Sequence, residues 1–135
     1  MMKQSVSAIE VAKLLLSYDP GREYFIDGKM FPVSSDETNP PTVGNFRLNK
    51  MLHICQMLHY AKYGKSLFSE DLRAFPRGGI VYPVYKGYFA LYNEELKPEE
   101  ITIEPQKKEF IKKNYYYFKN YHDKALETFS HDDIA

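Results

Sequence analysis

Four polar residues lie at helical spacing inside the most apolar segment of the chain, and they are the first candidates for chemistry. They follow one another at steps of four, four and three: Asn45, Asn49, His53 and Gln56. On a helix, these steps place them along one side. Because a buried amide needs a hydrogen-bond partner, the stripe either bonds neighbouring backbone, which we favour, or lines a pocket for a nucleotide or another small ligand.

No arrangement typical of a catalytic or metal site accompanies this polar stripe. Cys55 and His59 are four residues apart and would share a helix face, but zinc needs three or four ligands and His53 points in another direction. The glycines are not spaced as in a phosphate-binding loop, and the sequence contains no G-x-S-x-G. We therefore expect no catalytic residue, no metal and no cofactor. Cys55 should be buried and inert, and Lys50 should be a solvated or snorkelling side chain rather than a base.

Tyrosine is the unusual residue of this chain, which has 12 Tyr and 9 Phe but no Trp. Two groups recur at helical spacing: Tyr82, Tyr85, Tyr88 and Tyr92, and Tyr115, Tyr116, Tyr117 and Tyr121. Three consecutive tyrosines on a helix cannot all face one core, since each residue turns the chain by about 100°. Exposed tyrosines often anchor protein–protein interfaces. We expect some of them to contact a partner, and the alternative is that their hydroxyls merely reach the surface from core positions.

Length and charge exclude several classes of protein. The 135 residues suffice for one compact domain over residues 1–135. Eighteen basic residues balance eighteen acidic ones, which excludes a strongly cationic nucleic-acid binder. The lysines of residues 107–119 still leave RNA contact through lysine and stacked tyrosine as an alternative. No membrane segment or secretory signal is apparent and Cys55 is the single cysteine, so we expect a cytoplasmic protein.

The polar stripe requires a helix over Gly44–Tyr63. Apolar residues surround nearly its whole circumference, so it should be packed on several sides at the centre of the domain. Before it we expect a helix over Ser5–Ser17, which begins with a capping box between Ser7 and Glu10 and is ended by a Pro-Gly sequence. Between the two helices, residues 23–41 are predicted to form a small hairpin over Glu23–Val33 and then a polar loop.

The two tyrosine groups require two further helices. One is predicted over Ile80–Tyr92, after a turn at Arg77-Gly78-Gly79, and a long final helix is predicted over Gln106–Ser130. Between them, Glu94–Pro105 should be a loop with one helical turn near Pro98–Glu100. The expected fold class is mainly α with a minor β part. It is a single compact helical domain around a central buried helix, with a small β-hairpin or short strands.

Two segments follow the motifs of a known family. The first is Asn45-Phe-Arg-Leu-Asn-Lys-Met-Leu-His-Ile-Cys-Gln with Tyr60-Ala-Lys-Tyr-Gly-Lys-Ser-Leu-Phe68. It is similar to N-x-x-L-x-K-L-L-x-x-x-Q followed by Y-G-x-x-L-F. The second, Ala74–Tyr85, is similar to an aromatic-x-x-G-P-V-V stretch, with Gly79 in place of the usual proline. With these motifs the chain resembles the Panacea antitoxin domain, also called the SocA-like domain, over about Ser7–His131. Compared with the family's usual connection, residues 23–41 are longer and look like an insertion.

The resemblance implies a protein-binding function without catalysis. Members of the family neutralise unrelated toxic proteins, one branch delivers its toxin to a Clp protease, and many occur in prophages or other mobile elements. It therefore implies a protein toxin encoded nearby as the partner, with a Clp-type protease as a further partner in that branch. The residues that we expect at a partner, from the resemblance and the tyrosine groups together, are Asn45, Lys50, Gln56, Tyr82, Tyr85, Tyr88, Tyr92, Tyr116 and His131.

Three functions thus follow from the sequence, in order of preference. The first is an antitoxin-type module that neutralises a toxin by direct contact, alone or as a protease adaptor. The second is a small nucleotide-binding or ligand-binding protein, or an enzyme, built on the polar stripe. The third is a nucleic-acid-binding regulator that uses the lysines of the final helix.

Overall fold

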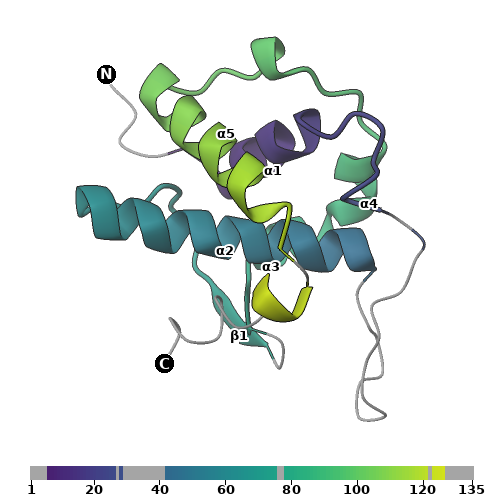
Figure 1. Ribbon diagram of the computed structural model, residues 1–135, viewed down its shortest axis with the longest axis horizontal. Helices are drawn as coiled ribbons and strands as arrows, with labels where there is room; N and C mark the ends of the chain where they lie inside the picture. The colour runs from purple at the N-terminus through teal and green to yellow at the C-terminus, as the bar shows by residue number, and fades with distance from the viewer. Residues whose placement is uncertain (1–5, 27, 29–41, 76–77, 122, 127–135) are drawn as a thin grey trace.

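The computed structural model describes residues 6–26, 28, 42–75, 78–121 and 123–126 (Figure 1). In chain order its elements are α1 (Ala8–Ser17), α2 (Val43–Tyr63), β1 (Arg73–Phe75), β2 (Gly78–Ile80), α3 (Tyr82–Lys86), α4 (Tyr88–Tyr92), the short 3₁₀ helix η1 (Pro98–Glu100) and α5 (Pro105–Phe118). The fold is a mostly helical small domain with one short β-hairpin, which confirms the expected class. The helical turn predicted near Pro98–Glu100 is also confirmed.

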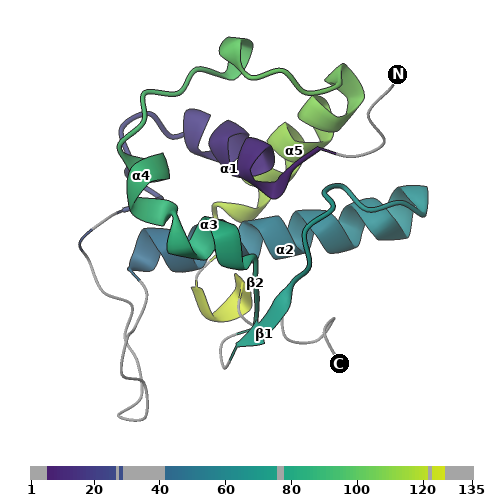
Figure 2. The ribbon, with the colours of Figure 1, turned by 180° about the vertical axis from the view of Figure 1, so that it is seen from behind.

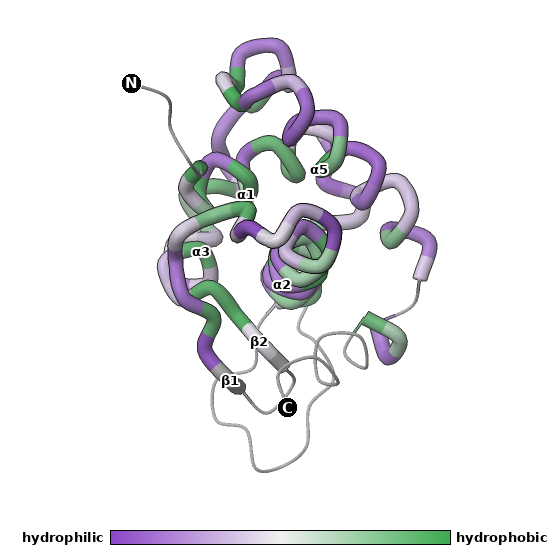
Figure 3. The backbone as a smooth tube through the Cα atoms, turned by 90° about the vertical axis from the view of Figure 1, so that its left-hand side faces the viewer, coloured by the Kyte–Doolittle hydropathy of each residue, from purple (hydrophilic) through white to green (hydrophobic). Residues whose placement is uncertain are grey.

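Helix α2 is the centre of the domain, as its all-round apolar pattern predicts. It contacts α1, α3, α5 and β2, and a view along its axis shows these elements arranged around it (Figure 3). Thr42 caps its first turn, because the Thr42 hydroxyl accepts from the backbone N–H of Asn45 at 3.2 Å. The helix ends at Gly64, whose φ of 69° favours glycine.

Helix α1 packs against α2 and α5 and also contacts α3 and α4 (Figure 2). The predicted capping box is present: the Ser7 hydroxyl accepts from the Glu10 N–H at 3.1 Å, and the Glu10 carboxylate accepts from the Ser7 N–H at 3.0 Å. The helix begins at Ala8, later than predicted, because the preceding Val6 pairs with Phe68 in an isolated parallel bridge.

The hairpin of this fold lies at β1 and β2, which pair antiparallel with Ala74 opposite Gly79. The turn predicted over Arg77-Gly78-Gly79 is therefore wrong for the two glycines, which belong to strand β2. The physical reason lies outside the segment, because side chains of α2 bond the backbone of residues 79 and 81. Glycine spacing alone does not reveal such contacts.

The segment between α1 and α2, residues 23–41, lies mostly outside the described residues. Of the hairpin predicted over Glu23–Val33, the described part Glu23–Phe25 forms bends and no strand. The carboxylate of Asp19 holds these bends by accepting from their three backbone N–H groups at 3.0, 2.9 and 2.8 Å. One buried carboxylate thus satisfies donors that would otherwise need a strand partner.

The single helix predicted over Ile80–Tyr92 is divided into α3 and α4 at Gly87. This residue has φ −94° and ψ 12°, which departs from helical geometry. Backbone hydrogen bonds still continue across the break, from the Gly87 N–H to Pro83 at 3.1 Å and from the Leu91 N–H to Gly87 at 3.2 Å. The two short helices therefore follow each other closely and share one buried side.

The helix predicted over Gln106–Ser130 is interrupted, because α5 ends at Phe118 and the chain becomes helical again only at residues 123–126. Residues 127–130 lie outside the described part. The buried side chains of α5 are Ile111, Tyr115 and Phe118. Tyr117, between two of these buried residues in the sequence, is exposed. Beyond the turn after α5, the Arg47 guanidinium on α2 donates to the Asp123 carboxylate at 2.8 Å, so the chain returns to α2 instead of continuing straight.

Candidate functional site

Three residues of the polar stripe, Asn45, Asn49 and Gln56, bond the backbone of neighbouring elements, as we favoured. The Asn45 amide donates to the Tyr85 carbonyl at 3.0 Å. The Asn49 amide donates to the Asn45 side-chain oxygen at 2.9 Å, and its own oxygen accepts from the Val81 N–H at 2.9 Å. Both asparagines are buried. These two side chains therefore fasten α3 and the end of β2 to the central helix.

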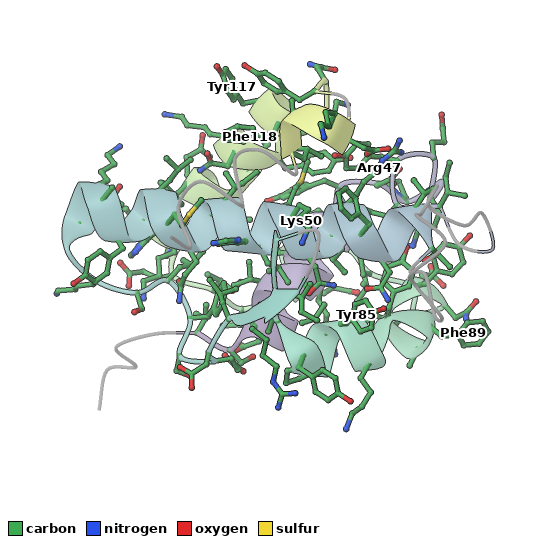
Figure 4. All side chains as sticks on the ribbon, turned by 90° about the horizontal axis from the view of Figure 1, so that it is seen from below. Arg47, Lys50, Tyr85, Phe89, Tyr117 and Phe118 are labelled. Atoms are coloured by element: carbon green, nitrogen blue, oxygen red, sulfur yellow. The ribbon has the colours of Figure 1, made fainter. Side chains whose placement is uncertain are left out.

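Gln56 and Lys50 complete this set of internal bonds. The Gln56 amide donates to the Phe68 carbonyl at 2.8 Å, and its oxygen accepts from the N–H groups of Leu67 and Phe68 at 2.7 and 3.1 Å. Lys50 corrects our expectation of a solvated side chain. Only 1% of it is exposed, and its ammonium donates to the Gly79 carbonyl at 2.9 Å (Figure 4).

The motif residues of the polar stripe are thus structural in this fold. Asn45, Lys50 and Gln56 were expected at a partner, and in the structure their side-chain nitrogens donate to the chain's own backbone carbonyls. This chain has Gly79 where the family has proline. The bond to Lys50 does not depend on that difference, because glycine and proline both have the backbone carbonyl that accepts from the ammonium. His131 lies outside the described residues.

The first tyrosine group divides between the core and the surface. Tyr88 is 3% exposed and its hydroxyl donates to the Phe25 carbonyl at 3.0 Å, so it cannot reach a partner. Tyr82, Tyr85 and Tyr92 are half-buried. Tyr92 also lies under the Arg22 guanidinium, 5.7 Å from the ring centre.

The most exposed large apolar side chain on this segment is one that the sequence reasoning missed, Phe89, at 69%. The buried side of α3 and α4 is formed by Val84, Tyr88 and Leu91. Tyr82 on α3 is half-buried, and Lys86 and Phe89, on either side of the break at Gly87, are exposed. We call Tyr82, Lys86 and Phe89 the outer α3–α4 face.

Two cations, Arg73 and Lys86, lie over the Tyr82 ring of this face. The guanidinium carbon of Arg73, on β1, is 4.2 Å from the centre of the Tyr82 ring. The ammonium of Lys86 is 5.5 Å from the same centre. Both cations are exposed. The outer α3–α4 face therefore combines an exposed phenyl ring with two positive charges.

The second tyrosine group forms a separate surface on α5. Tyr115 is buried, whereas Tyr116 and Tyr117 are 44% and 59% exposed. The Lys119 ammonium lies 5.0 Å from the Tyr116 ring centre, and the hydroxyls of Tyr117 and Tyr121 are hydrogen-bonded at 2.9 Å. Figure 4 shows that Tyr117, on α5, and Phe89, on α4, lie on opposite sides of α2.

Cys55 is buried, as predicted. Burial raises the pKa of its thiol to about 12. His59, which the sequence placed on the same helix face as Cys55, contacts the Lys65 carbonyl through Nδ1 at 2.7 Å. Among the described residues, no three histidine, cysteine or acidic side chains are grouped as a metal ion would need.

We expect native Cys55 to resist alkylation. At pH 8 the thiolate is the reactive form, and a pKa of about 12 leaves almost none of it. Iodoacetamide should therefore label the denatured protein within minutes and the native protein only as fast as it unfolds. Because the folded pKa is raised, the protonated thiol favours folding below its ordinary pKa, and this contribution is lost as the pH rises towards 12.

Cys55→Ala is the control for the pH dependence, since this variant should lose less stability between pH 9 and pH 11 than the parent. Rapid stoichiometric labelling of the native protein at pH 8 would show that the thiol is accessible.

Comparison with known proteins identifies the family. The family model described as the SocA-like antitoxin, Panacea domain, matches residues 48–134. This range is more than half of the chain and begins at Leu48, within α2. No curated protein and no solved structure matched the chain. The chain therefore belongs to the SocA-like Panacea antitoxin domain family.

Proposed function

We propose that this protein is an antitoxin that neutralises a protein toxin by direct contact, and that the toxin docks on the outer α3–α4 face. Family membership supports a toxin as the partner. The observation that carries the location is the 69% exposure of Phe89. A phenyl ring has no polar atom that water can satisfy, so burying one at an interface contributes about 1.5–3 kcal/mol.

The support beneath Phe89 suits an interface anchor. Val84, Tyr88 and Leu91 pack the opposite side of the same helices into the core. The Tyr88 hydroxyl bond to Phe25 fixes α4 to the segment that follows α1. A ring presented on a fixed helix loses little conformational freedom when a partner covers it, and affinity gains from that preorganisation.

The tyrosines of α5 are weaker candidates for the anchor. Tyr116 already packs near Tyr18, with ring centres 5.9 Å apart, and lies beneath Lys119. The Tyr117 hydroxyl already has Tyr121 as its partner. We therefore place the toxin on the outer α3–α4 face and keep the α5 surface as the comparison in the test.

Neutralisation by masking requires only this one surface and a stoichiometric complex. Delivery of the toxin to a Clp protease would add a second binding event and shorten the lifetime of the toxin. We propose masking as the primary step. Toxin abundance should then stay unchanged when a cell lacking the protease is compared with its parent, while growth is rescued in both.

Phe89→Ala is expected to weaken toxin binding about thirtyfold, because truncating a central apolar anchor costs about 2 kcal/mol. The toxin is sought as the adjacent gene's product that arrests growth when expressed alone. The dissociation constant is measured by calorimetric titration, and rescue is measured in a growth assay. The melting temperature of the variant should stay within about 2 °C of the parent, since an exposed ring contributes little to folding.

Tyr117→Ala is the matched control, because it also removes an exposed aromatic ring from a helix. It should bind toxin as the parent does. Loss of binding in Tyr117→Ala with normal binding in Phe89→Ala would move the interface to α5. If no protein partner is recovered and both variants rescue growth like the parent, the interaction function itself is wrong.

A further inference from the structure

We infer that the toxin segment that docks on the outer α3–α4 face is acidic, and that Arg73 and Lys86 receive its carboxylates beside Phe89. This inference rests on the proposed function and adds the chemistry of the partner to it. It follows from the charge of the segment, the positions of the two cations and their lack of counter-ions in the described part of the chain.

The segment that carries the face is purely cationic. From Leu72 to Asn93 the sequence contains Arg73, Arg77 and Lys86 but no aspartate or glutamate. The whole chain has a net charge of zero, so this segment departs from the average. The α5 surface differs, because Glu109 lies on its exposed side with the lysines.

Within the described residues, the two cations have no acidic partner on their own chain. The ion pairs found there join Lys13 to Glu94 and Arg47 to Asp123, and neither includes Arg73 or Lys86. Both side chains are directed instead to the Tyr82 ring, at 4.2 and 5.5 Å from its centre. Their charge is therefore open to a ligand.

The ring contact prepares these cations for an anion. A cation held over the half-buried Tyr82 ring is attracted by that ring and loses part of its side-chain freedom before any partner arrives. The guanidinium N–H groups can then bind a carboxylate through two hydrogen bonds. Because Lys86 and Phe89 are both exposed and lie only three residues apart in the chain, a partner that buries the phenyl ring brings its neighbouring side chains near Lys86. Acidic side chains are the complementary choice.

The double charge reversal Arg73→Glu with Lys86→Glu tests this inference in the full-length protein with the toxin. We expect the association rate constant to fall at least tenfold at 50 mM salt, and the salt dependence seen in the parent to disappear or change sign. Exposed charges at an interface act mainly through long-range attraction, so the effect should shrink at 500 mM salt. Association rates are measured by stopped-flow fluorescence or surface plasmon resonance at both salt concentrations.

Lys112→Glu with Lys113→Glu is the matched control, because it makes the same change of charge at two exposed lysines of α5. Its association rate should stay within about twofold of the parent, as expected for charges remote from the interface. Circular dichroism and thermal melting check that both double variants are folded. If the Arg73/Lys86 reversal does not fold, the pair Arg73→Gln with Lys86→Gln replaces it, with a smaller loss in the same direction.

The outcomes separate this inference from the proposed function. If Phe89→Ala loses binding while the Arg73/Lys86 reversal keeps the parent's rate and salt dependence, the toxin docks there but its segment is not acidic. If neither Phe89→Ala nor the Arg73/Lys86 reversal affects binding, both proposals fail. Competition with the toxin by a single-stranded RNA oligonucleotide, lost in the reversal, would show that the cations bind phosphate and would overturn the inference. If the Arg73/Lys86 reversal variant regains binding to a toxin whose acidic residue is changed to lysine, the inference is supported directly.

Discussion

Gly44→Ala is expected to lower the free energy of unfolding by about 3 kcal/mol or more, although it adds a single methyl group. The new Cβ would overlap the Tyr88 hydroxyl and lie 2.5 Å from the Ile26 carbonyl oxygen and 2.6 Å from the Phe25 carbonyl carbon. Two of these three atoms belong to backbone, so no side-chain rotation relieves the overlap. The surrounding bonds would have to break or lengthen.

Two hydrogen bonds hold the backbone of Phe25 and Ile26 close to Gly44 on α2. The Gly44 N–H donates to the Ile26 carbonyl at 2.8 Å, and the Tyr88 hydroxyl donates to the Phe25 carbonyl at 3.0 Å. Overpacking alone costs about 1–3 kcal/mol, and each hydrogen bond lost adds about 0.5–1.5 kcal/mol. Their sum gives the expected value and predicts a lower melting temperature.

Urea denaturation of a set of variants measures this effect. Gly21→Ala is the matched control, because its Cβ would meet only the flexible Glu23 side chain, at 3.2 Å. Its stability should stay within about 0.5 kcal/mol of the parent. In a Tyr88→Phe background, Gly44→Ala should cost less than in the parent, since the overlapping hydroxyl is gone. Equal costs in both backgrounds, or a cost near that of Gly21→Ala, would show that α4 does not approach Gly44.

The sequence was sufficient to predict the helices whose own residues determine them. The α2 pattern is apolar on nearly all sides, and a helix of that kind is stable only when neighbours surround it. Ser7 and Glu10 form the capping box because their spacing allows each side chain to reach the other's backbone. Such signals are local, and the structure confirms both.

The polar stripe shows what local signals leave out. Spacing predicted that Asn45, Asn49 and Gln56 share one side of a helix and bond to backbone, but not which backbone. The partner of Asn49 is Val81, 32 residues further along the chain. Lys50 was expected in solvent because isolated lysines are rarely buried, and the Gly79 carbonyl that receives it comes from a distant strand.

The candidate surface was only partly predictable for a related reason. The tyrosine spacing led to the correct segment, yet a tyrosine hydroxyl is equally suited to a buried bond, as at Tyr88, and to a surface. Phe89 becomes recognisable only once Val84 and Leu91 are known to form the buried side. The break at Gly87 then shows that two short helices, and not one long one, present it.

Asp19→Ala should destabilise the protein by about 3–5 kcal/mol, the largest stability effect that we expect of any single surface-loop substitution here. The Asp19 side chain is 7% exposed. Its Oδ1 accepts from the Glu23 N–H at 3.0 Å, and its Oδ2 accepts from the N–H groups of Tyr24 and Phe25 at 2.9 and 2.8 Å. Alanine leaves all three donors without their acceptor, and Phe25 is fully buried.

Asp19→Asn is the informative control, because its one carbonyl oxygen can still accept from Tyr24 and Phe25. It loses the bond to Glu23, an exposed residue that water can reach, so its cost should be about 1–2 kcal/mol. Equal destabilisation by alanine and asparagine, measured by urea denaturation, would contradict the division of bonds between the two oxygens.

The same turn also connects to the candidate surface. Arg22 follows Asp19 with a φ of 51°, and its guanidinium donates to the carbonyls of Tyr92 and Glu94 at 3.0 Å each. Releasing the Asp19 bonds should therefore free the C-terminal end of α4 as well. We expect amide hydrogen exchange in α4 to rise more in Asp19→Ala than exchange in α5, because α5 receives none of these bonds. A uniform rise across both helices would mean that Asp19 stabilises the whole domain without a particular connection to the helix that carries Phe89.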